Sequence, residues 1–71
     1  IYPNPNNGTF SLAIKKEAIG GTINVLNPLG QLVFSKNITQ QKTTVNIPNL
    51  TKGIYFVKVL PLGITQKILI D

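Results

Sequence analysis

The sequence predicts an all-β fold, a sandwich or a barrel, because apolar residues alternate with polar ones and turn residues interrupt the alternation. About six short runs have the period of two expected of strands with one buried face. Turns separate these runs about every 8–12 residues, a spacing typical of small β-sandwiches and barrels. No segment has a sustained helical period, so we expect no helix beyond a single turn.

The runs can be followed in order along the chain. Their apolar positions are Phe10, Leu12 and Ile14; Ile23 and Val25; Leu32 and Phe34; Val45 and Ile47; Tyr55, Val57 and Val59; and Ile64, Ile68 and Ile70. In each run we expect these residues to share one face and the residues between them to share the other. Phe10, Phe34 and Tyr55 are therefore predicted to pack in the core. Phe56 is expected on the opposite face.

The breaks between the runs consist of residues suited to turns. Gly20 and Gly21 end the loop before the second run. The stretch 27–30, Asn-Pro-Leu-Gly, suits a type I turn with Pro28 at its second position, after which Gly30 adopts the left-handed conformation. The last two runs are joined as a hairpin through 61–63, Pro-Leu-Gly. Between the fourth and fifth runs, Leu50 is expected to fill the core from its loop.

The length indicates one small domain, residues 1–71, which we interpret as a fragment of a longer secreted protein. A domain of this size buries only about 60% of its unfolded surface. The chain has no cysteine, which excludes a disulfide and a thiolate metal site. Its 42% hydrophobic content is enough for a compact core. We therefore expect stability to rest on that core and on a well-paired sheet.

The residue inventory argues against catalysis within the chain. General acid–base chemistry needs a histidine or a pair of carboxylates. The chain has no histidine, and its two carboxylates are Glu17 in a loop and Asp71 at the end. A serine acting with a lysine stays open on the residues alone, with Ser11 or Ser35 as the nucleophile. We predict no catalytic residue, no metal ligand and no cofactor, although the parent protein can still be an enzyme.

The chain is basic, with seven lysines, no arginine and a formal net charge of +5. The lysines are spread along the sequence, whereas nucleic-acid sites usually contain arginine and a basic stripe. We therefore expect no nucleic-acid partner. Weak attraction to an anionic surface such as lipopolysaccharide stays open. No apolar run approaches the length of a membrane-spanning helix, about 18 residues or more.

Four motifs follow one another in an order that resembles one family. They are 3–8, Pro-Asn-Pro with a glycine at the end; 25–30, Val-Leu-Asn-Pro-Leu-Gly; 50–55, Leu-x-x-Gly-Ile-Tyr; and 67–70, Lys-Ile-Leu-Ile. Together they look like the type A C-terminal sorting domain of type IX (Por) secretion cargo, over the whole chain. The family often has an acidic residue and an arginine around its Leu-Gly turn. Here Asn27 and Gln31 occupy those places, and the chain ends at Asp71 rather than at a basic residue.

The resemblance implies a fold and a function. Domains of the family are small Ig-like antiparallel β-sandwiches, here of about six to seven strands. They sit at the C-terminus of secreted or cell-surface proteins of Gram-negative bacteria and direct the cargo from the periplasm through the outer-membrane translocon. A sortase-like peptidase then removes the domain and attaches the cargo to anionic lipopolysaccharide or releases it. The alternative is a generic Ig-like accessory or adhesion domain that binds carbohydrate or protein.

The resemblance also assigns candidate site residues. The sorting motif comprises Pro3, Asn4, Pro5, Gly8, Leu29, Gly30, Leu50, Gly53, Tyr55 and Lys67. We expect its glycines and prolines to set backbone geometry rather than to touch a partner. The last strand is the candidate contact with the translocon, through Ile64, Gln66, Lys67, Ile68, Leu69 and Ile70. Such a contact would use β-augmentation, and a free edge would also allow an edge-strand dimer.

Overall fold

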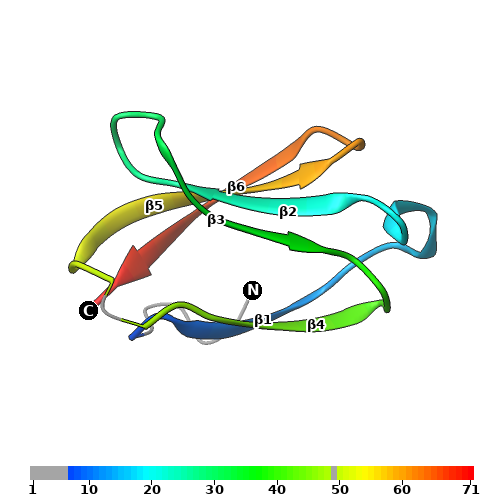
Figure 1. The fold of residues 1–71 in the computed structure, drawn as a ribbon, viewed down its shortest axis with the longest axis horizontal. Helices are drawn as coiled ribbons and strands as arrows, with labels where there is room; N and C mark the ends of the chain where they lie inside the picture. Colours follow the sequence, from blue (N-terminus) through cyan, green and yellow to red (C-terminus); the bar gives the residue numbers. More distant parts are fainter. Residues whose placement is uncertain (1–6, 49) are drawn as a thin grey trace.

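The computed structural model describes residues 7–48 and 50–71 and places six strands and one short 3-10 turn in them (Figure 1). Pro3, Asn4 and Pro5 of the predicted sorting motif lie outside the described residues. The elements in order are β1 (Thr9–Ala13), η1 (Lys16–Ala18), β2 (Thr22–Leu26), β3 (Leu32–Asn37), β4 (Lys42–Asn46), β5 (Gly53–Leu60) and β6 (Ile64–Ile70). Each strand coincides with one of the runs of alternating residues in the sequence.

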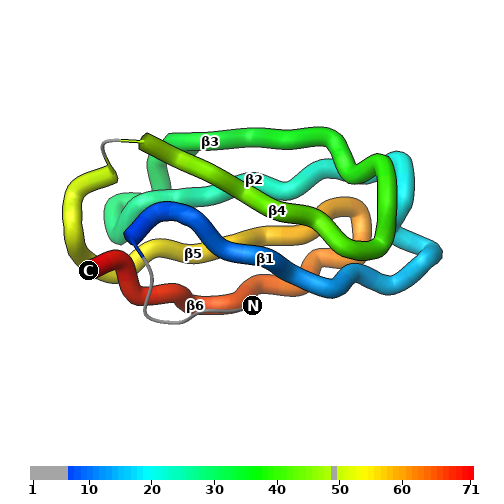
Figure 2. The backbone as a smooth tube through the Cα atoms, turned by 90° about the horizontal axis from the view of Figure 1, so that it is seen from below, coloured from blue at the N-terminus to red at the C-terminus, as the bar shows by residue number. Residues whose placement is uncertain are grey.

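The strands form two antiparallel sheets packed face to face. One sheet has two strands in the order β1-β4, and the other has four in the order β3-β2-β5-β6. Figure 2 shows β1 and β4 lying across the middle of the larger sheet, with β3 and β6 at its two edges. This arrangement confirms the predicted all-β sandwich of six to seven strands.

The core lies between the two sheets. Inward-facing residues of every strand form it, but most residues of β3 remain outside it. The largest fully buried side chains are those of Phe10, Ile23, Ile38, Ile68, Ile70, Val25, Val45 and Val57. Tyr55 is also buried, as predicted, and Leu50 packs against the cluster from its loop. Alternation therefore marked the core correctly in β1, β2, β4, β5 and the second half of β6. At the start of β6, Ile64 remains 47% exposed.

Strand β3 departs from the prediction that Leu32 and Phe34 share a buried face. Phe34 is half-buried and packs against the core, as predicted, whereas Leu32 is 57% exposed. The register between β2 and β3 shifts at Val25 and Leu26, where the ladder is irregular. Because Val33 is the extra residue, Leu32 pairs with Leu26 and takes the opposite face from Phe34, which pairs with the buried Val25. Because β3 is also an edge strand, it has less of the opposite sheet to pack against.

The turns follow the chemistry of the sequence. Gly30 has a φ of 83° and donates its N–H to the Asn27 carbonyl oxygen at 2.9 Å, as predicted for the β2–β3 turn. The β5–β6 connection is a hairpin in which the Gly63 N–H bonds the Val59 carbonyl oxygen at 2.8 Å. Among the described residues, no helix is long and apolar enough to cross a membrane.

Candidate functional site

The sandwich has two ends of different character, which we call the turn end and the lysine end. The turn end contains Gly8, the β2–β3 turn, the loop before β5 and the C-terminal Asp71. The strand pairing brings these segments together, because Leu26 pairs with Phe56 and Gly53 pairs with Ile70. At the lysine end lie η1, the β3–β4 link and the β5–β6 hairpin. The pairs Thr22–Leu60 and Ala13–Lys42 bring these segments together.

The described residues of the predicted sorting motif gather in the half of the sandwich near the turn end, where Lys67 pairs with Phe56. Gly8 lies against the residue that follows β4: its carbonyl oxygen accepts the Ile47 N–H at 2.9 Å. A Cβ on Gly8 would lie 2.6 Å from the Ile47 carbonyl oxygen, and the φ of Gly8 is 109°. A side chain is therefore excluded here by both backbone conformation and space.

The β2–β3 turn is held by the side chain of Asn27. Its Oδ1 accepts the N–H groups of Leu29 at 3.0 Å and Gln31 at 2.9 Å, and its Nδ2 donates to Gln31 Oε1 at 2.8 Å. The turn is thus rigid although it is exposed. At its tip Leu29 is 84% exposed, the highest value among the large hydrophobic residues described. The neutral Asn27–Gln31 pair thus bridges the turn.

The Leu-x-x-Gly-Ile-Tyr motif forms the start of β5. Gly53 opens the strand with a φ of 148°, and Leu50 closes this end of the core. Tyr55 is 7% exposed, and its hydroxyl donates to the Thr51 carbonyl oxygen at 2.7 Å. This bond fastens the loop to the strand, as a tyrosine corner does in Ig-type sandwiches. The motif is therefore a device that fixes how the chain enters β5.

The candidate contact strand β6 has one face in the core and one face in solvent. Ile68 and Ile70 are each 1% exposed, so a partner could meet only their backbone in the folded domain. Leu69 is 42% and Ile64 47% exposed, and Gln66 and Lys67 are exposed too. Within 7–48 and 50–71, β6 pairs with β5 alone and is the outermost strand of its sheet. An edge strand of this kind is a natural site for strand addition.

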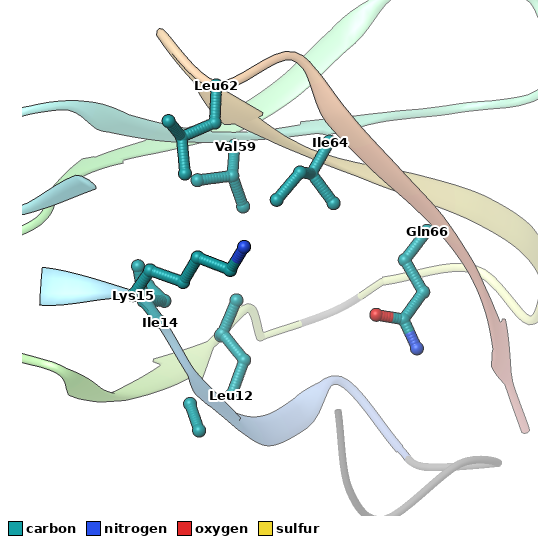
Figure 3. Close-up of a pocket in the computed structure, with 8 residues that line it drawn as sticks. Leu12, Ile14, Lys15, Val59, Leu62, Ile64 and Gln66 are labelled. Atoms are coloured by element: carbon teal, nitrogen blue, oxygen red, sulfur yellow. The ribbon is translucent and has the colours of Figure 1, made fainter. Parts of the chain in front are cut away.

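A groove lies at the lysine end between β6 and β1, which are edge strands of the two sheets within residues 7–48 and 50–71 (Figure 3). Its volume is about 180 Å³, and its walls are Leu12, Ala13, Ile14, Lys15, Val59, Leu62, Ile64 and Gln66. Apolar side chains form most of these walls. The side chain of Lys15 runs across the opening and places its ammonium between Leu12 on one wall and Val59 and Ile64 on the other.

A comparison with protein families decides what this sandwich is. The model of the secretion system C-terminal sorting domain matches residues 1–71, the whole of the chain. The chain belongs to this family. A comparison with curated proteins found no match.

The sorting domain is the C-terminal sorting signal of the type IX secretion system, in agreement with the resemblance seen in the sequence. The protein that carries it is a secreted or cell-surface protein of Bacteroidetes, and the domain interacts with the type IX secretion machinery. Its role as a signal is not itself catalytic, whatever the parent protein does. A generic adhesion domain is not favoured.

The sequence assigned the motif residues of the sorting domain but did not identify the groove. The two walls come from residues 12–15 and from residues 59–66, which are far apart in the chain. Only the strand order brings them together, and alternation alone does not fix that order. Lys15 was interpreted as one of several surface lysines. Leu62 in the predicted hairpin was the one signal in the sequence, because an apolar residue in a turn indicates a hydrophobic surface that is partly uncovered.

Proposed function

We propose that residues 1–71 form one domain at the end of a longer secreted protein and act as a folded signal that the type IX machinery contacts at β6. The observation that carries the proposal is the position of β6: it is the outermost strand of its sheet in the described part of the chain. Its core face anchors it, and its other face is exposed. A folded strand edge offers backbone hydrogen bonds to a partner without requiring the domain to unfold.

Membership in the family supports a proposal for the rest of the pathway. The cargo enters the periplasm by its own N-terminal signal peptide, and the sorting domain then directs it through the outer-membrane translocon. A sortase-like peptidase cleaves near Ile1 or before it, and the cargo is attached to anionic lipopolysaccharide or released. The cleavage position lies outside the described residues. The turn-end motifs support this route by giving the signal a defined shape rather than a reactive group.

Fusion of residues 1–71 to a periplasmic reporter tests the function directly. In a strain that has the secretion system we expect the reporter in the medium or on the cell surface, and in a strain without the translocon we expect it in the periplasm. Equal retention in both strains would contradict the proposed function. The alternative, an adhesion domain, predicts that retention.

The contact at β6 needs a variant that leaves the core intact. Deleting 67–71 would remove Ile68 and Ile70 from the core and would confuse unfolding with lost recognition. Lys67→Glu changes an exposed side chain of β6, and Lys52→Glu makes the same change of charge in the loop before β5. We expect about a ten-fold loss of secreted reporter for Lys67→Glu alone, because charge reversal at a contact is costly. Equal secretion by both folded variants would argue against contact at β6.

A further inference from the structure

The outward face of the smaller sheet is polar, and its side chains bond one another. Thr9 donates from its hydroxyl to Asn46 Oδ1 at 2.9 Å, and the hydroxyl oxygens of Ser11 and Thr44 lie 3.2 Å apart. Each bond joins two residues that pair across β1 and β4. Neither strand contributes a large exposed hydrophobic side chain. This face therefore offers a partner little apolar surface to remove from water.

The outward face of the larger sheet has an apolar row in the half near the turn end. Leu32 of β3 pairs with Leu26 of β2, and Leu26 pairs in turn with Phe56 of β5. Residues that pair across antiparallel strands share a face. These three residues face away from the core, because the neighbours Val25 and Val57 are buried. The larger sheet is thus apolar on both faces over this row, and part of its apolar surface remains uncovered.

The β2–β3 turn rises beside this row. Figure 1 shows the turn standing above the larger sheet, on the side away from β1 and β4. Leu29 at its tip is 84% exposed, and Leu32 and Val33 after it are 57% and 40% exposed. Eight large hydrophobic residues are exposed in the described part of the chain, and three of them lie within positions 29–33. Such clustering is typical of an interaction surface rather than of hydrophobic residues scattered singly.

The fold of the turn does not require a leucine at its tip. Gly30 supplies the positive φ of 83°, and the Asn27 side chain accepts the N–H groups of Leu29 and Gln31. Leu29 contributes its backbone N–H to this network, which any residue except proline could do. Because the turn is already ordered, little conformational entropy is lost when the side chain at its tip binds. The turn therefore presents an apolar side chain at a fixed position.

The segment that forms this surface carries no charge. No Asp, Glu, Lys or Arg occurs from position 18 to position 35, although the whole chain has a net charge of +5. The cores of protein–protein interfaces are likewise depleted of charged residues, because a buried charge loses its hydration. Anionic lipid attracts clusters of lysine or arginine, and this segment has none. The chemistry of the surface fits an uncharged, apolar patch of a folded protein.

We propose that the apolar row and the tip of the β2–β3 turn form a second contact with the type IX machinery, in which Leu29 enters an apolar pocket of a machinery protein and Leu32 packs at its rim. The choice of partner rests on the proposed function, in which this machinery reads the domain as a folded signal. The surface is separate from the one proposed on β6, because β3 and β6 stand at opposite ends of the strand order. Variants of the two surfaces can therefore be tested independently.

The test measures secretion of the reporter fused to residues 1–71 in a strain that has the secretion system. Leu29→Ser and Leu32→Thr make exposed apolar positions polar, and Ile19→Thr does the same at the lysine end, where Ile19 is 43% exposed. We expect secretion to fall about ten-fold for Leu29→Ser and about four-fold for Leu32→Thr, because binding buries less apolar surface, and less than about two-fold for Ile19→Thr. Thermal unfolding of each purified fusion checks that the domain folds.

A conservative variant tests whether the tip needs an apolar side chain. Leu29→Met keeps the apolar character and most of the volume, and a pocket for leucine accepts methionine at little cost. We expect its secretion to stay within about two-fold of the wild-type value. A loss equal to that of Leu29→Ser would overturn the inference.

The outcomes separate this inference from the proposed function. If the wild-type fusion is secreted and both Leu29→Ser and Leu32→Thr match Ile19→Thr, the machinery does not contact this surface, and the sorting function stands. If the wild-type fusion stays in the periplasm, the sorting function itself fails, and the choice of partner fails with it.

Two further measurements on the purified chain distinguish other occupants. Sedimentation should show a monomer, and a dimer that Leu29→Ser dissociates and Ile19→Thr preserves would assign the surface to a second copy. Vesicles of equal parts phosphatidylcholine and phosphatidylglycerol at physiological salt should bind the wild-type chain and Leu29→Ser equally weakly. Strong binding that Leu29→Ser abolishes and Ile19→Thr preserves would assign the tip to a membrane. Either of these results would overturn the proposal.

Discussion

The turn end and the lysine end of this sorting domain are built on different principles. The turn end contains most of the motif residues through which the chain resembles its family, and there three residues set the path of the backbone: Gly8 admits a close neighbour, Asn27 holds a turn and Tyr55 anchors a loop. The lysine end contains most of the charge and an open apolar groove. The comparison teaches that residues that mark a family can serve to fix the path of the backbone rather than to supply a charged or reactive surface.

The strongest test of this contrast is Gly8→Ala at the turn end. The new Cβ would lie 2.6 Å from the Ile47 carbonyl oxygen, at a φ of 109°. We expect the free energy of unfolding to fall by about 3 kcal/mol, since strain and steric overlap add. Urea denaturation of the purified chain measures the change.

Gly20→Ala is the matched control for this prediction. Gly20 has a similar φ of 97°, but nothing lies within 4 Å of the place that its Cβ would take. The cost should therefore be that of the left-handed backbone alone, about 1 kcal/mol. Equal losses in the two variants would show that the close approach at Ile47 does not matter and that the turn end is less tightly built than described.

The second prediction concerns the anchor of β5. Tyr55→Phe removes the hydroxyl that donates to the Thr51 carbonyl oxygen at 2.7 Å and leaves the ring in the core. We expect a loss of about 1.5 kcal/mol in the free energy of unfolding, because a partly buried hydrogen bond is lost. Thr51→Ala keeps the carbonyl oxygen and serves as the control, with a change below about 0.5 kcal/mol. A large loss in the control would assign the effect to the loop instead.

The sequence predicted most of the fold, for a definite physical reason. In β1, β2, β4 and β5, each strand has one face in the core, so alternation in the sequence and burial in the structure agree. The prediction was wrong for Leu32, where a register shift and an edge position let an apolar residue face solvent. Neither a register shift nor an edge position produces a pattern of alternation that could be recognised in the sequence.

The candidate site was predicted less completely than the fold. Motif residues such as Gly30 were identified because a turn imposes a local requirement on residue type. The hydrogen bonds that Asn27 makes were not foreseen, although its place before Pro28 was. The groove depends on which edge strands of the two sheets are neighbours, and that is a property of the whole chain. Lys15 and Ile64 could acquire their shared position only through folding.

The third prediction compares the two side chains that bridge the β2–β3 turn. Asn27→Ala removes the acceptor of the Leu29 and Gln31 N–H groups, and we expect a loss of about 1 kcal/mol. Gln31→Ala removes only the exposed bond between the two side chains and should cost less than about 0.5 kcal/mol. Hydrogen exchange of the Leu29 amide, measured by NMR, should quicken in the first variant and not in the second. Equal exchange in both would mean that Asn27 does not hold the turn.

The smallest expected effect tests the hydrogen bond by which Lys36 of β3 joins the larger sheet to β4 of the smaller sheet. Lys36→Met keeps much of the side-chain length but removes the ammonium that bonds the Thr44 carbonyl oxygen of β4. Because the bond is exposed, the free energy of unfolding should fall by less than about 1 kcal/mol. The larger consequence concerns association: the freed edge of β4 can pair with a second copy, so sedimentation should detect dimers at high protein concentration. Lys42→Met changes the same charge at the start of β4 and should stay monomeric. If both variants dimerise alike, the lost charge rather than the opened edge drives association. The bond at Lys36 then does not protect the edge of β4 from pairing with a second copy.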